Sequence, residues 1–193
     1  KFDNIKNINI SGLENSDNSA LHEQIQNLNL GNIFFINQDE IEKILDSNTL
    51  IEKYYVYKNY PSTIDIKIIR TKFLAKINYE NKIYLVGSNG KLTSKKFHDK
   101  YLPFIFGKPE VNDFLHLKKI IDQSKFRYDQ ILNFYFFPSK RWDLELKSKV
   151  FLKLPEKNIK QKLDDTYKLL NDQNFKNIKI IDARIKNQII LND

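Results

Sequence analysis

The side chains best suited to catalysis or metal binding are scattered along this chain. It has three histidines, His22, His98 and His116, and no two have the i, i+4 spacing that places two imidazoles on one metal ion. Cysteine is absent, so there is no thiolate nucleophile and no Cys-type zinc site. The five glycines form neither a phosphate-binding loop nor a nucleophile elbow. We therefore predict no catalytic residue, metal site or cofactor.

Two pairs of adjacent carboxylates, Asp39-Glu40 and Asp164-Asp165, fall within segments that are predicted to be helical. Adjacent residues of a helix point in different directions, which favours solvated carboxylates over an acid/base pair. We interpret both pairs as solvated helix surface. Catalytic residues can also converge from distant positions, but no pattern in the sequence favours an enzyme.

The chain of 193 residues carries 32 Lys and Arg against 24 Asp and Glu, a net charge of +8. Only four of the basic residues are arginines, the side chain that binds phosphates and bases in bidentate fashion. We interpret the charge as a lysine-rich solvated surface and expect no nucleic-acid partner. Hydrophobic residues make up 41% of the chain, enough for a buried core. No apolar run approaches the roughly 20 residues of a spanning helix.

The first 70 residues alternate between strand and helix patterns. A short strand ends at Gly12, a helix follows polar residues 16–19, and Asn37 can cap a second helix with Glu40 three residues later. Two alternating segments flank Tyr60-Pro61 and predict an antiparallel hairpin whose buried side chains are Ile64, Ile66 and Ile68. The order β-α-α-β-β predicts a small α+β unit with two helices on one face of a sheet.

The remaining residues are predicted to be mostly strands, and the boundary near residues 70–73 has no flexible linker. Residues 102–107, with Pro103 and Gly107, are interpreted as a crossing segment. A helix over residues 112–123 is predicted with Leu115, Lys119 and Ile120 near its apolar stripe, and Trp142 is expected in the core. The other predicted elements are strands at 73–79, 82–86, 131–137, 142–146 and 150–154, a helix at 159–170, and one or two strands over 178–182 and 185–191.

The final segment is the natural candidate for an exposed sheet edge. An unpaired edge strand offers free N–H and C=O groups to a partner chain. The alternative is an ordinary paired strand blunted by Lys179, Lys186 and Asp193. The sequence does not decide between the two.

Six short motifs follow one another in a fixed order. They are Ile5 to Gly12, the hairpin Leu50 to Ile68 with Tyr60-Pro61, the turn Val86 to Gly90, Leu102 to Gly107, Arg141 to Leu146 with Leu154-Pro155, and Ile181 to Arg184. Together this series resembles the extracytoplasmic part of the bacterial cell-division family FtsQ/DivIB. The sequence departs from the family at Arg70 and Phe73, at the Lys147-Ser148-Lys149 turn, and at Ala183.

The resemblance implies a fold and a function. The expected fold is α+β, with a POTRA domain over residues 1–71 and a mainly antiparallel β domain with flanking helices over residues 72–193. The implied protein is not an enzyme: it recruits FtsB and FtsL at the division septum and helps to control septal peptidoglycan synthesis. Other division proteins would bind its POTRA domain. A single helix before Lys1 would anchor it in the inner membrane, with the present residues in the periplasm.

The resemblance also implies partner-binding residues near the C-terminus. FtsB would add a strand to the backbone of residues 185–191, a segment that includes Ile189 and Leu191. By motif position, Arg184 matches a partner-contacting arginine, while Ile185 and Asn187 stand where other members use Tyr and Ser. Lys140 and Lys168 would add charged contacts from the preceding turn and helix.

Two other functions remain open at this point. A POTRA-bearing chaperone of outer-membrane protein assembly or secretion would use a similar βααββ unit, although no second such unit follows Arg70. A basic nucleic-acid-binding domain is the third alternative.

Overall fold

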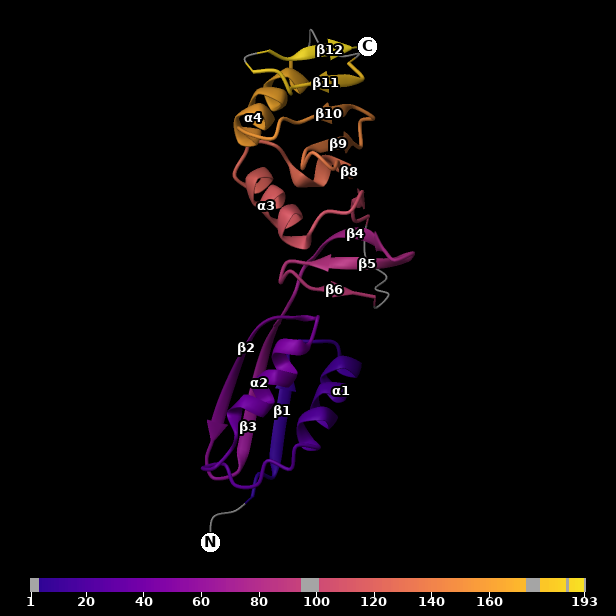
Figure 1. Cartoon of the computed structure of the whole chain (residues 1–193). Coiled ribbons are helices and arrows are strands. Elements are labelled where there is room, and N and C mark those ends of the chain that lie inside the picture. The colour runs from indigo at the N-terminus through magenta and orange to yellow at the C-terminus, as the bar shows by residue number, and fades with distance from the viewer. Residues whose placement is uncertain (1–3, 95–100, 173–177, 187, 193) are drawn as a thin grey trace. The chain divides into compact units, whose positions relative to one another are not determined.

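The computed structural model describes residues 4–94, 101–172, 178–186 and 188–192 of the chain. The structure divides into two compact units, the first made of residues 1–72 and 87–93 and the second of residues 73–86 and 94–193 (Figure 1). Residues 87–93 belong to the first unit although they follow residues 73–86 of the second. The expected boundary between residues 71 and 72 stays a prediction.

The first unit has the predicted βααββ order. Its elements are β1 (Asn7–Ser11), α1 (Asn15–Gln26), α2 (Gln38–Ser47), β2 (Ile51–Asn59) and β3 (Thr63–Arg70). The sheet order is β1-β3-β2, with β1 parallel and β2 antiparallel to the central strand β3. The α+β class and the POTRA arrangement expected from the sequence are therefore confirmed.

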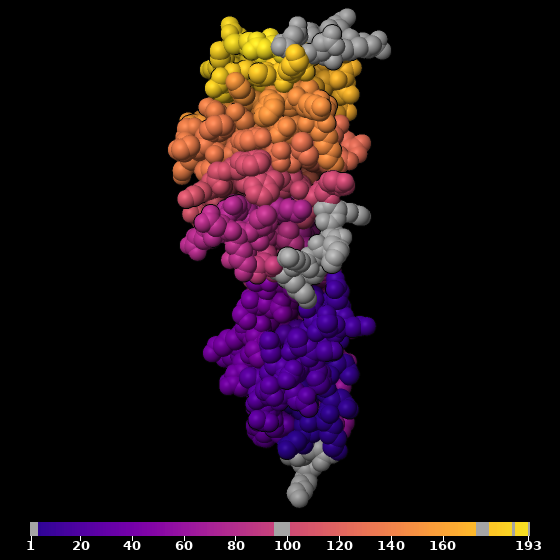
Figure 2. Space-filling model, turned by 90° about the vertical axis from the view of Figure 1, so that its right-hand side faces the viewer, coloured from indigo at the N-terminus to yellow at the C-terminus, as the bar shows by residue number. Residues whose placement is uncertain are grey.

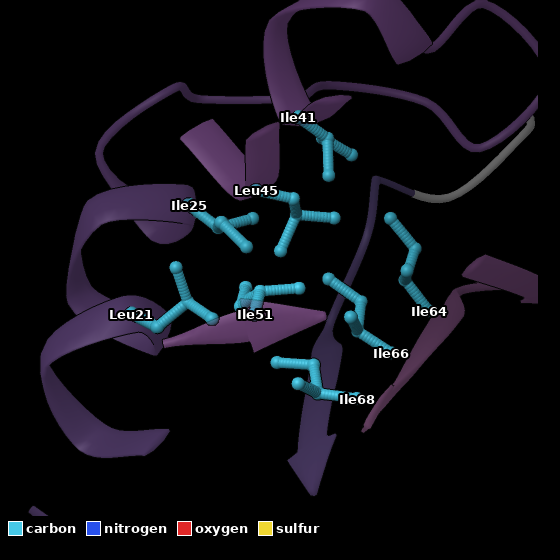
Figure 3. Close-up of a cluster of buried hydrophobic side chains, with 8 residues drawn as sticks. All are labelled: Leu21, Ile25, Ile41, Leu45, Ile51, Ile64, Ile66 and Ile68. Atoms are coloured by element: carbon cyan, nitrogen blue, oxygen red, sulfur yellow. The ribbon is translucent and has the colours of Figure 1, made fainter. Parts of the chain in front are cut away.

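The core of the first unit lies between its sheet and its helices. Ile64, Ile66 and Ile68 alternate along β3 and are buried, as period two requires. Figure 3 shows side chains of both helices pointing toward these strand residues; they are Leu21, Ile25, Ile41 and Leu45. Seen from the side of α1, the unit presents a closed surface of packed atoms (Figure 2).

Two local predictions in the first unit have clear physical counterparts. Asn37 caps α2, and its side-chain oxygen accepts a hydrogen bond from the Asp39 amide at 3.2 Å. The chain reverses after β1 at Gly12, where φ is +113° and an added Cβ would lie 1.9 Å from the carbonyl oxygen of Ile68. Only glycine fits this close approach.

The turn at residues 87–90 is held by the first unit. The Asn89 side-chain amide donates to the carbonyl oxygens of Thr49 and Ile51 at 3.0 and 2.9 Å. The Ser88 hydroxyl donates to the Glu52 carboxylate at 2.6 Å. The short strand β6 (Leu92–Thr93) follows this turn.

The second unit is built on one mixed sheet with α3 (Val111–Asp122) and α4 (Ile159–Leu170) on the same face (Figure 1). The strand order is β12-β11-β10-β9-β8-β7-β4-β5. The β4–β7, β7–β8 and β10–β11 pairs are parallel, and the β8–β9, β9–β10 and β11–β12 pairs are antiparallel. The remaining elements are β4 (Phe73–Tyr79), β5 (Lys82–Gly87), β7 (Phe104–Phe106), η1 (Tyr128–Gln130), β8 (Ile131–Phe136), β9 (Trp142–Leu146), β10 (Phe151–Lys153), β11 (Ile180–Asp182) and β12 (Ile190–Asn192).

Aromatic rings fill the centre of this second core. Phe114 on α3 lies 5.3 Å from Phe134 on β8, and Phe134 lies 6.2 Å from Trp142 on β9, measured between ring centroids. All three are buried. The expectation that Trp142 is a core residue is correct.

Two sequence-based interpretations of the second unit are wrong. Residues 102–107 are not a crossing segment, because β7 lies inside the sheet between β4 and β8. Gly107 ends this strand with φ +95°, and an added Cβ would lie 2.4 Å from the Phe136 carbonyl oxygen. Pro103 and Gly107 flank the three-residue strand without interrupting it.

The buried face of α3 also differs from the predicted stripe of Leu115, Lys119 and Ile120. The buried residues are Phe114, Leu117 and Ile121, which keep the helical spacing but lie on another face. Phe114 decides this orientation, because its ring packs against the aromatic centre of the sheet.

Replacing Ile66 with Ala tests the core of the first unit. The substitution leaves a cavity under two helices, so we expect it to lower the free energy of unfolding of this unit by about 2–5 kcal/mol. Ile69→Ala on the same strand is the control, because the Ile69 side chain is exposed and its loss should cost less than about 0.5 kcal/mol. Hydrogen exchange of the β2 and β3 amides in the full chain measures both. Equal effects of the two substitutions would contradict the assigned core.

Candidate functional site: the C-terminal sheet edge

The last strand of the chain forms an edge of the second sheet. β12 pairs antiparallel with β11, with Ile181 opposite Leu191 and Asp182 opposite Ile190. It is the terminal strand in the sheet order, so in the described ranges no other strand pairs with its outer side. An edge of this kind presents main-chain donors and acceptors to a partner.

The predicted strand over residues 185–191 is wrong for most of its length, because β12 covers only Ile190–Asn192. Before β12 the chain makes a turn, where the Gln188 amide donates to the Ile185 carbonyl at 3.3 Å. The Lys162 ammonium of α4 also donates to the carbonyl oxygens of Ile185 and Gln188, at 3.1 and 3.0 Å. These bonds engage carbonyls that a continuous strand would leave free.

An open groove of about 1030 Å³ lies between α4, the preceding loop and this turn. Most charged side chains along it are basic. Its lining residues are Arg141, Pro155, Glu156, Lys157, Asn158, Gln161, Lys162, Asp165, Arg184, Ile185, Lys186, Gln188 and Ile189. The groove and the β12 edge together form the candidate site, which we call the C-terminal edge site.

A row of alternating charges crosses three strands beside this site. Strand pairing places Lys153 of β10 next to Asp143 of β9 on one side and Asp182 of β11 on the other. Arg141 pairs with Asp143 at 3.2 Å. Arg184 donates from its Nε atom to Asp182 at 2.8 Å. Opposite charges on neighbouring strands stabilise this register.

The two carboxylates of the row have different environments. The hydrogen bond from Arg184 is the main reason that the pKa of Asp182 lies below its ordinary value. Asp143 is buried, and loss of hydration raises its pKa although Arg141 opposes the change. The row therefore combines Asp182, whose anion the bond from Arg184 favours, with Asp143, whose anion burial disfavours.

The predicted partner-binding residues fall into three groups. Arg184, Ile185 and Ile189 line the groove, and Leu191 lies in β12. The Arg184 side chain keeps 42% of its surface exposed although it pairs with Asp182. The structure therefore brings these four predicted residues together at the C-terminal edge site.

Lys140 and Lys168 lie outside the groove. Lys140 follows β8 in a turn and lines a separate hollow of about 480 Å³, together with Trp142. Lys168 projects from α4 and lies 3.8 Å from Asp165, measured from Nζ to Oδ1. Asn187, which was predicted to contact the partner, and His98 lie outside the described residues.

Sequence reasoning missed Lys162, Asp143 and Asp182 as parts of the site. Lys162 leaves no local signal, because its carbonyl partners are more than twenty residues away. The two Arg–Asp pairs do have a signal. In both Arg141–Asp143 and Asp182–Arg184 the partners are two residues apart, a spacing that places both side chains on one face of a strand.

Within residues 4–94, 101–172, 178–186 and 188–192, no group of three or more His, Cys, Asp or Glu side chains could hold a metal ion. Among the helices of these ranges, none is long and apolar enough to cross a bilayer.

Comparison with protein families assigns both units. Residues 3–69 match the FtsQ-type POTRA domain, and residues 75–184 match the C-terminal domain of the cell division protein FtsQ/DivIB. The chain belongs to the FtsQ/DivIB family. This family consists of membrane-anchored division scaffolds, and the chain is a cell-division protein. The C-terminal match ends at Arg184, so the turn and β12 lie beyond it.

Curated relatives agree with this assignment. The chain is 27% identical over 190 residues to the cell division protein FtsQ of Rickettsia bellii, covering 95% of the present chain and 70% of that protein. It is also 27% identical over 202 residues to FtsQ of Rickettsia conorii, with the same coverage. A POTRA domain followed by an FtsQ/DivIB domain favours the division function over the chaperone alternative.

Arg184→Ala should raise the pKa of Asp182 toward its ordinary value, because the main cause of the shift is removed. A carboxylate with a lowered pKa in the folded state stabilises the fold above its unfolded pKa, near pH 4, and this contribution is lost as the pH falls through the folded value. The variant should therefore lose less stability on acidification. A carboxyl-carbon NMR titration measures the change, and an unaltered Asp182 pKa would refute the assigned pairing.

Proposed function

We propose that this protein is a non-enzymatic division scaffold that recruits FtsB and FtsL-like proteins through the C-terminal edge site and helps to regulate septal peptidoglycan synthesis. The observation that carries this proposal is an unpaired edge strand, β12, next to a basic groove. Main-chain pairing supplies affinity in strand addition, and side-chain contacts supply specificity.

The strand-addition step uses only the three residues of β12. Three residues provide few main-chain hydrogen bonds, so the groove must contribute much of the binding free energy. Ile185 and Ile189 offer apolar surface there, and Lys157 and Lys186 offer positive charge. We therefore infer a partner segment with an extended part for β12 and an acidic, partly apolar part for the groove.

Arg184 is the side chain best placed to join these two parts. It lies between β11 and the turn that leads to β12, and Asp182 holds its guanidinium in one orientation. A guanidinium has five N–H donors, so Arg184 can bind a partner carboxylate while it keeps Asp182. Holding the side chain in place before binding lowers the conformational entropy cost of the contact.

We further propose a location and a role for the rest of the molecule. A single N-terminal helix would anchor the protein in the inner membrane, and the present residues would lie in the periplasm at the septum. The POTRA unit would bind other division proteins. Membrane anchoring is a property of the FtsQ family, and the POTRA unit is of the FtsQ type.

Arg184→Ala is expected to weaken binding of the cognate FtsB periplasmic segment at least tenfold, or about 1.4 kcal/mol, because a charge-assisted contact is lost. Arg127→Ala is the matched control, since Arg127 forms the same type of i, i+2 pair with Asp129 away from the groove. Isothermal titration calorimetry measures both affinities. Equal binding by the two variants would remove Arg184 from the interface.

Proline substitutions at Ile190 and Leu191 test strand addition itself. Successive amides of an antiparallel strand point to opposite sides, so one of these two faces β11 and the other faces the open edge. Proline at the outward position should keep the β11–β12 pairing and abolish most FtsB binding. Hydrogen exchange of the β11 and β12 amides, with and without FtsB, identifies that position. Absence of any protection by FtsB on wild-type β12 would contradict strand addition.

A further inference from the structure

One end of the first unit has no charged side chain in either of its two loops. Residues 27–37 connect α1 to α2, and residues 59–63 comprise the turn between β2 and β3 with one strand residue on either side. Neither segment contains Asp, Glu, Lys or Arg, in a chain of which 29% is charged. We call these two segments the uncharged pole.

The two loops of the uncharged pole meet where the described chain begins. The Ile5 amide donates to the Gly31 carbonyl at 2.8 Å, and the Lys6 amide donates to the Ser62 carbonyl at 2.9 Å. Asn4 forms an isolated bridge with Asn32. Figure 1 shows β1 starting and β2 ending at this same end of the unit.

Aromatic rings project from the uncharged pole. Ile33 is fully buried and anchors its loop, while the next two residues point outward: Phe34 is 51% exposed and Phe35 is 82% exposed. Tyr60 of the other loop is 61% exposed, and its ring lies 4.8 Å from that of Phe34. Exposing three large aromatic side chains together is unfavourable in water, so the patch indicates a binding surface.

We propose that the uncharged pole inserts Phe34, Phe35 and Tyr60 into the headgroup region of a lipid bilayer. This inference rests on the proposed N-terminal membrane attachment, because the chain enters the structure at this pole. It goes beyond attachment by assigning the POTRA unit its own membrane contact. That contact would fix the distance and tilt of the unit above the bilayer.

The chemistry of the pole fits a membrane interface. Aromatic side chains concentrate at the level of lipid headgroups, where one part of the ring is apolar and its surroundings are wet. Asn, Ser and Thr of the loops can bond to headgroups, and no loop carboxylate faces the lipid phosphates. Along the chain, the nearest acidic residues are Asp39, in the first turn of α2, and Asp65, on β3. The Asp65 carboxylate accepts hydrogen bonds from the side chains of Asn9 and Asn59.

The open face of the same sheet offers a contrast. Tyr55 and Tyr57 are also about half exposed there, but Lys67 lies over the Tyr57 ring and Asp65 is on the neighbouring strand. Charged neighbours of both signs make that face unsuited to entering a bilayer. Tyr55 lies four residues before the pole along β2. Its ring is exposed but outside the proposed membrane contact, so position 55 is a matched control.

The absence of cysteine from the chain permits a direct test by site-specific labelling. Phe35→Cys and Tyr55→Cys variants of the full 193-residue chain carry an environment-sensitive fluorophore. An N-terminal histidine tag tethers them to phosphatidylcholine vesicles that contain a nickel-chelating lipid and a nitroxide-labelled lipid. We expect quenching and a blue shift at position 35 and neither at position 55. Adding Phe34→Ser and Tyr60→Ser should abolish the quenching at position 35.

An untethered measurement complements this test. Replacing Phe34, Phe35 and Tyr60 together with Ser should lower the vesicle partition coefficient by more than about tenfold, because buried aromatic surface is lost. No quenching at position 35, or equal quenching at both positions, overturns the proposal. A blue shift that appears without vesicles and grows with protein concentration would indicate self-association and would also overturn the proposal. FtsB binding in lipid-free solution is independent of these outcomes, so it tests the scaffold function separately.

Discussion

The register of β9, β10 and β11 is the constraint on which the candidate site depends. It places Lys153 between Asp143 and Asp182, and each carboxylate also bonds to an arginine. A shift by one residue would turn every side chain of a strand to the opposite face and break this alternation. The same register orients Arg184 at the start of the turn and aligns β11 for pairing with β12. The geometry of the edge therefore depends on this register.

Much of the first unit could be predicted because its signals are local. Alternation of Ile64, Ile66 and Ile68 determines the buried face of β3, and Asn37 marks the start of α2 by a hydrogen bond two residues away. Strands β8, β9 and β10 of the second unit were predicted for the same reason. In each case the side-chain pattern within one element decides the outcome.

The errors occurred where distant contacts override the local pattern. The aromatic centre of the sheet determines which face of α3 is buried, because Phe114 packs against Phe134. The sequence of α3 alone does not show that Phe134 is the partner of Phe114. A strand was predicted from Ile185 to Leu191, yet Lys162 of α4 engages the carbonyls of Ile185 and Gln188. Arg184 was found through its motif, and the groove beside it could not be, since its walls come from three separate segments.

The shortness of β12 has a consequence for the solubility of the protein. Long, flat, exposed edges invite identical copies to join side by side into fibres, and natural sheets avoid this by keeping edge strands brief. An edge of three residues forms too few main-chain bonds to hold a second copy that lacks complementary side chains. If the proposed function is correct, only a ligand that also fills the adjacent groove would gain enough contacts to remain bound.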